Sequence, residues 1–324
     1  MKTNAVLDWG YSGNEWAVSL LQGQILNGGL RHAYLFTGPP GIGRRTLALK
    51  LAQALLCENP PETGTFCGIC RQCTQLISLQ HPDLYLVEVQ EGDRQIKIEA
   101  VRELNRMLAL APYEADKQIA LLLNFDQASR GAANALLKTL EEPSSSSLLL
   151  LTAESAESLP STIASRCEVL RLRPLAKNEL TEELVGQEGV DKEEAGLAAR
   201  FSSGRPGLAL NLLSKEGALA ERRAWLDEMQ EILKSDLGQR FAYAENFQRD
   251  RTGLNDRLRF WLMWWRERLI GSESGVVDGQ DKNLSRGEIR RVIGQLQESL
   301  GALDGNANVR LSLESLLISL PKLD

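Results

Sequence analysis

A glycine-rich segment, GPPGIGRRT at residues 38–46, is the feature that most constrains the fold of this chain. It follows a short β-prone run at residues 34–37, and it precedes apolar residues that recur at helical spacing over 47–56. A strand, a glycine-rich turn and a helix in this order are typical of a phosphate-binding loop, where backbone N–H groups converge on a phosphate. The segment therefore predicts the first strand and helix of a parallel α/β sheet.

Strand-like and helix-like segments continue to alternate through the first half of the chain. Apolar runs at 119–125 and 148–151 are typical of strands buried on both faces, and residues 84–89 and 169–172 predict two more strands. Helical periodicity at 98–108 and 132–140 predicts helices between them. The pattern predicts an α/β domain, a parallel sheet covered by helices.

The pattern changes after Pro174, because no strand-like run follows it. Residues 176–215 predict short helices with a turn at 203–207, and longer amphipathic helices follow from about residue 216. One of them carries an apolar stripe made of Leu254, Leu258, Trp261, Leu262, Trp265 and Leu269. This stripe predicts the core of an all-α bundle, with a surface for stacking nucleic-acid bases as the alternative. We therefore expect three domains: residues 1–174, a small helical lid at 175–216 and a helical domain at 217–324.

The side chains of the phosphate loop differ from those that nucleotide hydrolysis needs. A working loop carries Lys where this chain has Arg44, and Ser or Thr where it has Arg45, while Thr46 comes one residue too late to ligate magnesium. Asp126 ends a predicted strand and could hold a metal, but the amide of Gln127 cannot act as a general base. The candidate nucleotide site is Gly38, Gly41, Gly43, Arg44, Arg45, Thr46 and Asp126, and we expect it to be inactive, without bound ATP.

Four of the five cysteines, Cys57, Cys67, Cys70 and Cys73, fall within 17 residues. Two overlapping Cys-x-x-Cys steps on a glycine-containing turn can wrap three thiolates around one ion, and Cys57 can supply the fourth ligand. Four thiolates suit a closed, tetrahedral structural zinc site. Reduced free thiols and an iron–sulfur cluster are the alternatives. The fifth cysteine, Cys167, is expected to pack as an apolar residue.

Three features together resemble a known family. They are the run GAANALLKTLEEP at residues 131–143, the four-cysteine insert after the loop helix, and the Ser165-Arg166-Cys167 motif. Together they resemble bacterial clamp-loader subunits of DNA polymerase III, which belong to the AAA+ superfamily. The degenerate phosphate loop matches the delta-prime family among them, because the motor subunits, gamma and tau, keep Lys followed by Thr or Ser.

The resemblance implies a function as well as a fold. Arg166 matches the arginine finger that one clamp-loader subunit inserts into the ATP site of its neighbour, where a guanidinium stabilises charge on the γ-phosphate. The implied partners are gamma/tau and delta subunits in a heteropentamer joined through the helical collar at 217–324, the sliding clamp, and primer–template DNA. The chain would then help to load the clamp without hydrolysing ATP itself.

Composition limits the alternatives. The net charge of −6 argues against a globally basic nucleic-acid binder. The apolar stretches are too short to predict a membrane span, and the start of the chain predicts no signal peptide, which favours the cytoplasm. An active clamp-loader ATPase with an unusual Arg-Arg loop remains one alternative function. A zinc-containing nucleic-acid-binding protein that acts outside replication is the other.

Overall fold

A computed structural model describes residues 8–187, 189–249, 253–274, 284–305 and 307–322. The chain divides into two compact units, residues 1–183 with 204–208, and residues 184–203 with 209–324. The first unit is α/β, and the second contains only helices among its described residues. The expected division into three domains stays a prediction.

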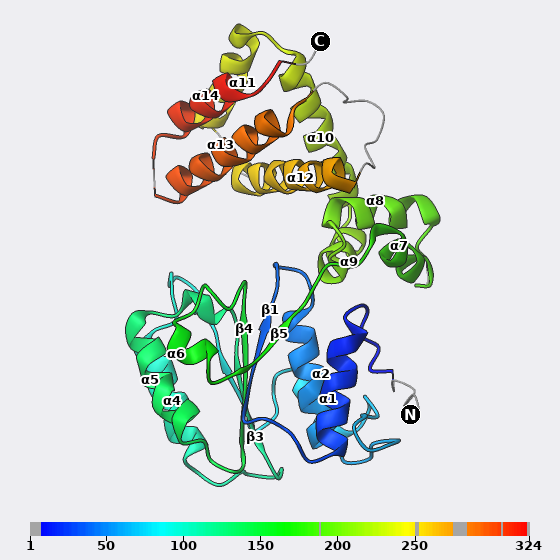
Figure 1. The fold of residues 1–324 in the computed structure, drawn as a ribbon, viewed down its shortest axis with the longest axis vertical. Coiled ribbons are helices and arrows are strands. Elements are labelled where there is room, and N and C mark those ends of the chain that lie inside the picture. Colours follow the sequence, from blue (N-terminus) through cyan, green and yellow to red (C-terminus); the bar gives the residue numbers. More distant parts are fainter. Residues whose placement is uncertain (1–7, 188, 250–252, 275–283, 306, 323–324) are drawn as a thin grey trace. The chain divides into compact units, whose positions relative to one another are not determined.

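The first unit holds a parallel sheet of five strands in the order β2-β3-β4-β1-β5 (Figure 1). The strands are β1 (Ala33–Thr37), β2 (Leu84–Val87), β3 (Gln118–Leu122), β4 (Ser147–Ala153) and β5 (Glu168–Arg171). The predicted parallel α/β fold is confirmed. The strand predicted over 119–125 is shorter than expected, because Asn124 adopts a left-handed conformation (φ 47°) and a short 3-10 helix, η1 (Phe125–Gln127), follows.

Helices cover both faces of this sheet. They are α1 (Glu15–Leu26), α2 (Arg44–Leu56), α3 (Arg71–Ile77), α4 (Ile98–Leu108), α5 (Arg130–Glu141) and α6 (Ser161–Ala164). Alternate residues of each strand enter opposite cores. In β3, Ile119 and Leu121 pack in the core with α1 and α2, whereas Ala120 and Leu122 pack with α4 and α5 (Figure 1). Burial on both faces explains why the strand sequences are continuously apolar.

The described elements after Pro174 are all helices, as the sequence predicts. They are α7 (Lys177–Val185), α8 (Lys192–Ser202), α9 (Pro206–Ser214), α10 (Ala218–Lys234), α11 (Leu237–Arg249), α12 (Leu254–Ser274), α13 (Arg286–Asp304) and α14 (Val309–Ser319). Leu258, Trp261 and Trp265 of α12 are buried, and the indole of Trp261 donates to the Trp225 carbonyl at 2.9 Å. The α12 stripe is therefore bundle core. None of the described helices has the length and apolarity to cross a bilayer.

Candidate functional site

The predicted site residues of the phosphate loop gather at the carboxyl edge of the sheet. The loop follows β1, Asn124 and Asp126 follow β3, and Glu154 follows β4. Two hydrogen bonds join these ends, from Gly38 N to the Glu154 carbonyl at 3.1 Å and from Asn124 N to Thr152 Oγ1 at 2.7 Å. This edge is where open parallel sheets bind ligands.

Arg44 turns inward at the first residue of α2. The residue is 8% exposed, and its Nη2 donates to Asn124 Oδ1 at 3.0 Å. Among the described residues, its Nη1 and Asp126 Oδ1 are buried without a hydrogen-bond partner. Burial lowers the pKa of Arg44, while the charges of Asp126 and Glu154 oppose that shift. The cation of the loop therefore faces the protein's own carboxylates.

The loop also bonds directly to the turn at 204–208, which belongs to the same unit. Leu208 N donates to the Gly41 carbonyl at 3.3 Å, and Arg205 Nη1 donates to the Pro40 carbonyl at 3.2 Å. A Cβ added at Gly41 would lie 2.9 Å from Leu208 Cβ. The close approach requires glycine here, and it brings the turn against the loop.

The N-terminal segment packs on the other end of the loop. Tyr11 Oη donates to the Ile42 carbonyl at 3.3 Å and lies 2.9 Å from where a Cβ on Gly43 would be. Burial raises the pKa of Tyr11, so the phenol stays neutral. Trp9 anchors the same segment, because its buried indole donates to the Gly64 carbonyl of the cysteine insert at 2.9 Å. The insert thus helps to hold a segment that covers the loop.

These residues do not supply the side chains of a hydrolytic site. Arg45 and Thr46 are exposed on α2, and Arg45 has no oxygen for a metal. Arg44, at the position of the usual lysine, already donates to Asn124. One end of the Arg44 guanidinium thus binds within the protein, while its Nη1 and Asp126 Oδ1 keep no hydrogen-bond partner among the described residues.

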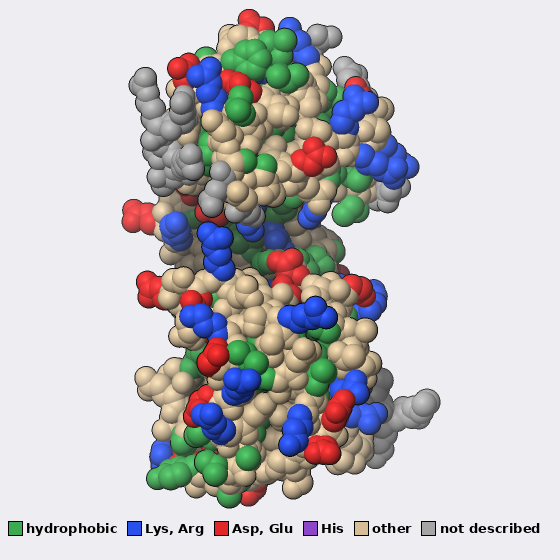
Figure 2. All heavy atoms as spheres, turned by 90° about the vertical axis from the view of Figure 1, so that its left-hand side faces the viewer, with side chains coloured by type: hydrophobic (Ala, Val, Ile, Leu, Met, Phe, Trp, Pro, Cys, Tyr) green, Lys and Arg blue, Asp and Glu red, His purple; other side chains and the backbone are tan. Residues whose placement is uncertain are grey.

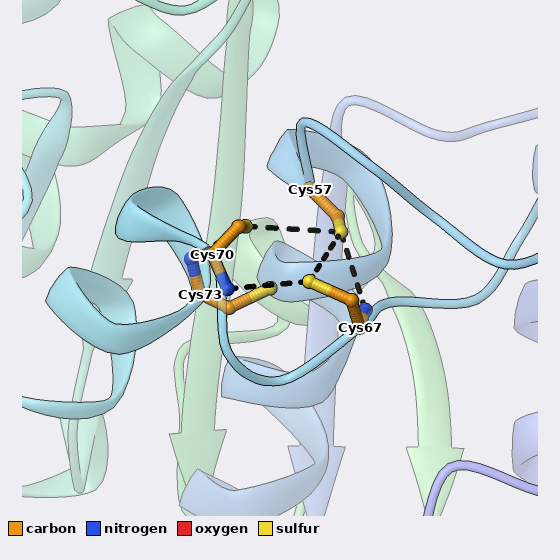
Figure 3. A group of neighbouring side chains, drawn as sticks. All are labelled: Cys57, Cys67, Cys70 and Cys73. Atoms are coloured by element: carbon orange, nitrogen blue, oxygen red, sulfur yellow. Dashed lines mark hydrogen bonds between the residues drawn. The ribbon is translucent and has the colours of Figure 1, made fainter.

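The second cluster consists of the four predicted cysteines, whose sulfur atoms all lie within 4.8 Å of one another (Figure 3). Cys57 Sγ lies 3.6 Å from Cys67 Sγ and 3.9 Å from Cys70 Sγ. Tetrahedral zinc with Zn–S bonds of about 2.3 Å separates its sulfurs by about 3.8 Å. The four cysteines can therefore hold a metal ion, as their spacing predicts.

Local structure positions each thiol. Cys57 follows the end of α2, and Cys70 is the N-cap of α3, which carries Cys73 in its first turn. Backbone N–H groups of Ile69 and Cys70 lower the pKa of Cys67 to about 6, which favours the thiolate that a metal needs. Cys73 is fully buried. The site is therefore built into the fold between two helices.

Arg166 lies in the turn between α6 and β5, on the face of the sheet opposite to α2 and the cysteine cluster. Its side chain is 35% exposed. The adjacent Cys167 packs against the α4–α5 core, and burial raises the pKa of its thiol to about 12. The motif thus combines a partly buried cysteine, whose thiol stays protonated, with an accessible arginine.

Sequence reasoning missed four contributors to these sites: Tyr11, Asn124, Leu208, and Glu141, whose carboxylate accepts a hydrogen bond from Arg166 Nη2. Their partners lie far away in the chain, so periodicity and spacing cannot find them. The turn at 203–207 was predicted only as a turn. Its two glycines are the signal in the sequence that other backbone segments approach this turn closely. A Cβ added at Gly204 would lie 2.1 Å from the Leu175 carbonyl oxygen, and a Cβ added at Gly207 would lie 3.0 Å from the Gly41 carbonyl oxygen.

The face of the first unit that carries α4 and α5 shows Lys and Arg interspersed with Asp and Glu (Figure 2). The two signs alternate along α4 itself, where Glu99, Arg102, Glu103 and Arg106 follow one another. A mixed surface of this kind gives little non-specific attraction to DNA phosphates.

Comparison with known proteins places the chain in a family. The family model described as "DNA polymerase III, delta subunit" matches residues 13–176, about half of the chain. The Bacillus subtilis DNA polymerase III subunit delta' is 32% identical over 268 residues, 80% of this chain and 79% of that protein. The Pseudomonas aeruginosa subunit delta' is 33% identical over 207 residues, 64% of this chain and 62% of that protein.

A tau subunit and a solved structure are also similar to this chain. The Escherichia coli DNA polymerase III subunit tau is 33% identical over 62% of this chain, but over only 31% of its own length. A DNA polymerase III gamma subunit-related protein from Thermotoga maritima shares the fold, with a TM-score of 0.54 at 20% identity, over 92% of this chain and 97% of that one. From the family match and the delta' relatives, we conclude that this chain belongs to the family of DNA polymerase III delta' subunits.

Proposed function

We propose that this chain is a clamp-loader subunit that does not hydrolyse ATP but completes the ATP site of a neighbouring subunit with Arg166. The contrast between two arginines carries the proposal. Arg44, where a hydrolytic subunit has lysine, is buried against Asn124, whereas Arg166 of the Ser-Arg-Cys motif is accessible. A guanidinium supplied in trans stabilises the charge on a transferring γ-phosphate, so the subunit contributes to hydrolysis without its own nucleotide.

The names of the relatives support other DNA polymerase III subunits as partners. Gamma/tau and delta subunits would complete a heteropentamer, with residues 217–324 as the joining collar and 175–216 as a lid. The assembled complex would open the sliding clamp and place it on primer–template DNA in the cytoplasm. Because the chain is acidic, its grip on DNA would depend on the complex rather than on its own net charge.

The metal of the cysteine cluster would be structural zinc. Four thiolates leave no open position for water or substrate, and the separations between the sulfurs suit tetrahedral coordination. Elemental analysis of the purified chain under reducing, chelator-free conditions should give about one zinc per chain. Iron in place of zinc, or no metal at all, would contradict this assignment.

The test of function is reconstitution of the full chain with gamma/tau and delta subunits of the same organism. We expect a stable complex by size-exclusion chromatography, and DNA-stimulated ATP hydrolysis that needs Arg166. Arg166→Ala should slow hydrolysis at the adjoining site by roughly 10³-fold. In single-turnover measurements, the ATP bound at that site should then no longer contribute to the observed hydrolysis. Full hydrolysis by the variant complex would refute the arginine-finger assignment.

Arg171→Ala is the matched control. Arg171 is an exposed arginine of the same unit and pairs with Glu157 at 3.1 Å, as Arg166 pairs with a glutamate. Its loss should leave hydrolysis unchanged. Equilibrium binding of ATP and magnesium to the isolated chain tests the alternative of an active ATPase, since micromolar affinity would contradict a subunit that holds no nucleotide.

A further inference from the structure

The guanidinium of Arg166 is held from two directions. Its Nη1 donates to the Thr162 carbonyl of α6 at 2.8 Å, and its Nη2 donates to Glu141 Oε1 at 2.7 Å. An arginine has five N–H donors. Within the described residues these two bonds occupy two of them, and the other three are left for an incoming phosphate.

Glu141 reaches Arg166 because of tertiary packing. It is the last residue of α5 and lies 25 residues before its partner in the chain. Helices α5 and α6 pack together, and Leu140 and Ile163 beside the pair are buried in the same core. The carboxylate is therefore attached to a rigid part of the fold, although its side chain is half exposed.

We infer that Glu141 is a positioning residue for Arg166, which holds the guanidinium in the orientation that meets the phosphate of a neighbouring subunit. This inference rests on the proposed function of Arg166. A long arginine side chain samples many rotamers when it is unrestrained, and each orientation away from the phosphate lowers the fraction of competent complexes. The fixed carboxylate and the α6 carbonyl together restrict that sampling before the subunits meet.

The ion pair is suited to this role because it is weak. Half-exposed pairs of this kind contribute little in water, since both ions remain hydrated. A phosphate carries more negative charge than one carboxylate. It can therefore bind the free N–H donors of Arg166 even though Glu141 stays paired with the same guanidinium. The expected contribution is therefore modest, about a two- to fivefold change in rate.

The neighbouring residue supplies a matched control. Glu142 follows Glu141 directly, is exposed, and takes part in none of the ion pairs between described side chains. Glu141→Ala and Glu142→Ala remove the same charge from the same helix end, but only the first frees Arg166. Any general effect of charge on DNA or subunit binding would appear in both variants.

The experiment measures DNA-stimulated ATP hydrolysis by the reconstituted complex that contains each full-length variant. We expect Glu141→Ala to lower kcat about two- to fivefold with an unchanged KM for ATP, and Glu142→Ala to leave both parameters unchanged. Glu141→Gln, which keeps a hydrogen-bond acceptor without the charge, should recover part of the lost rate. In the Arg166→Ala background, Glu141→Ala should cause no further change.

The outcomes distinguish the arginine-finger role of Arg166 from the positioning role of Glu141. If Arg166→Ala itself leaves hydrolysis intact, the proposed function is wrong. If Arg166→Ala abolishes the contribution of its site while Glu141→Ala matches Glu142→Ala, the finger stands and the positioning role is refuted. A higher kcat in Glu141→Ala would also overturn the inference, because it would show that the carboxylate restrains the finger.

Discussion

The two arginines of the first unit differ in what surrounds them. Arg44, at the phosphate loop, is 8% exposed as a residue and donates to Asn124 beside the carboxylates of Asp126 and Glu154. Arg166, in the turn before β5, keeps a side chain that is 35% exposed and pairs with the half-exposed Glu141. The guanidinium of Arg44 thus binds groups inside the protein, whereas that of Arg166 remains accessible at the surface.

Around Arg44, the protein's own groups surround the cation of a phosphate loop. A cation at the carboxyl edge of the sheet would usually face a bound phosphate. Here the protein itself provides the opposing groups, and residues 204–208 bond to the loop directly. Removal of a buried charge strongly destabilises a fold when its partners are left uncompensated, whereas removal of an exposed charge costs little.

The largest effect on stability should come from the cysteine cluster, which lies at the far end of the helix that Arg44 begins. Cys73→Ser should remove the metal and lower the free energy of unfolding by about 3–6 kcal/mol, part of the ~10–16 kcal/mol that zinc gives to isolated fingers. Denaturant unfolding and metal analysis measure both quantities. Cys167→Ala, outside the cluster, should keep the metal, and equal metal loss in both variants would contradict the assignment.

Arg44→Ala should come next. It leaves Asn124 Oδ1 without its donor and removes a buried cation that interacts with the carboxylate of Asp126, so we expect a loss of about 2–4 kcal/mol in urea unfolding. Arg45→Ala is the control, because Arg45 is the adjacent arginine and is exposed. It should change stability by no more than about 0.5 kcal/mol. Equal losses of stability in Arg44→Ala and Arg45→Ala would show that the buried arginine of α2 contributes no more to folding than the exposed one.

Arg166→Ala should have a smaller effect on folding than Arg44→Ala. The lost ion pair is largely exposed, so the free energy of unfolding should fall by less than about 1 kcal/mol. The same variant should nevertheless abolish the contribution of its site to hydrolysis in the complex. A destabilisation as large as that of Arg44→Ala would mean that Arg166 is a structural residue, and the comparison would fail.

The smallest expected effect is that of nucleotide on the isolated chain. A ligand at 100 times its Kd adds about 2.7 kcal/mol to the stability of the folded state. We expect millimolar ATP with magnesium to leave the unfolding midpoint unchanged, because Arg44 is already engaged within the protein. A clear upward shift would show that the loop opens and binds nucleotide.

Much of the architecture could be predicted from the sequence. The continuous apolar runs predicted parallel strands, because strands covered on both faces have no polar side, and Ile119 to Leu122 are indeed fully buried. The stripe of α12 predicted bundle core, because its apolar residues recur at helical spacing. Helices α1 and α3 were not predicted. Helix α3 is only seven residues long and lies within the cysteine insert, where spacing suggests a metal rather than a helix.

The glycine loop, the four-cysteine cluster and the Ser-Arg-Cys motif can each be read from residues close together in the chain, and the apolar runs predict strands that are buried on both faces. Only the tertiary structure decided that Arg44 turns toward Asn124, 80 residues away, and that Glu141 meets Arg166 across 25 residues. It also decided that Leu208 bonds to Gly41 and that Tyr11 packs beside Gly43. Such pairs depend on how helices pack on the sheet, and no local period or spacing records that packing.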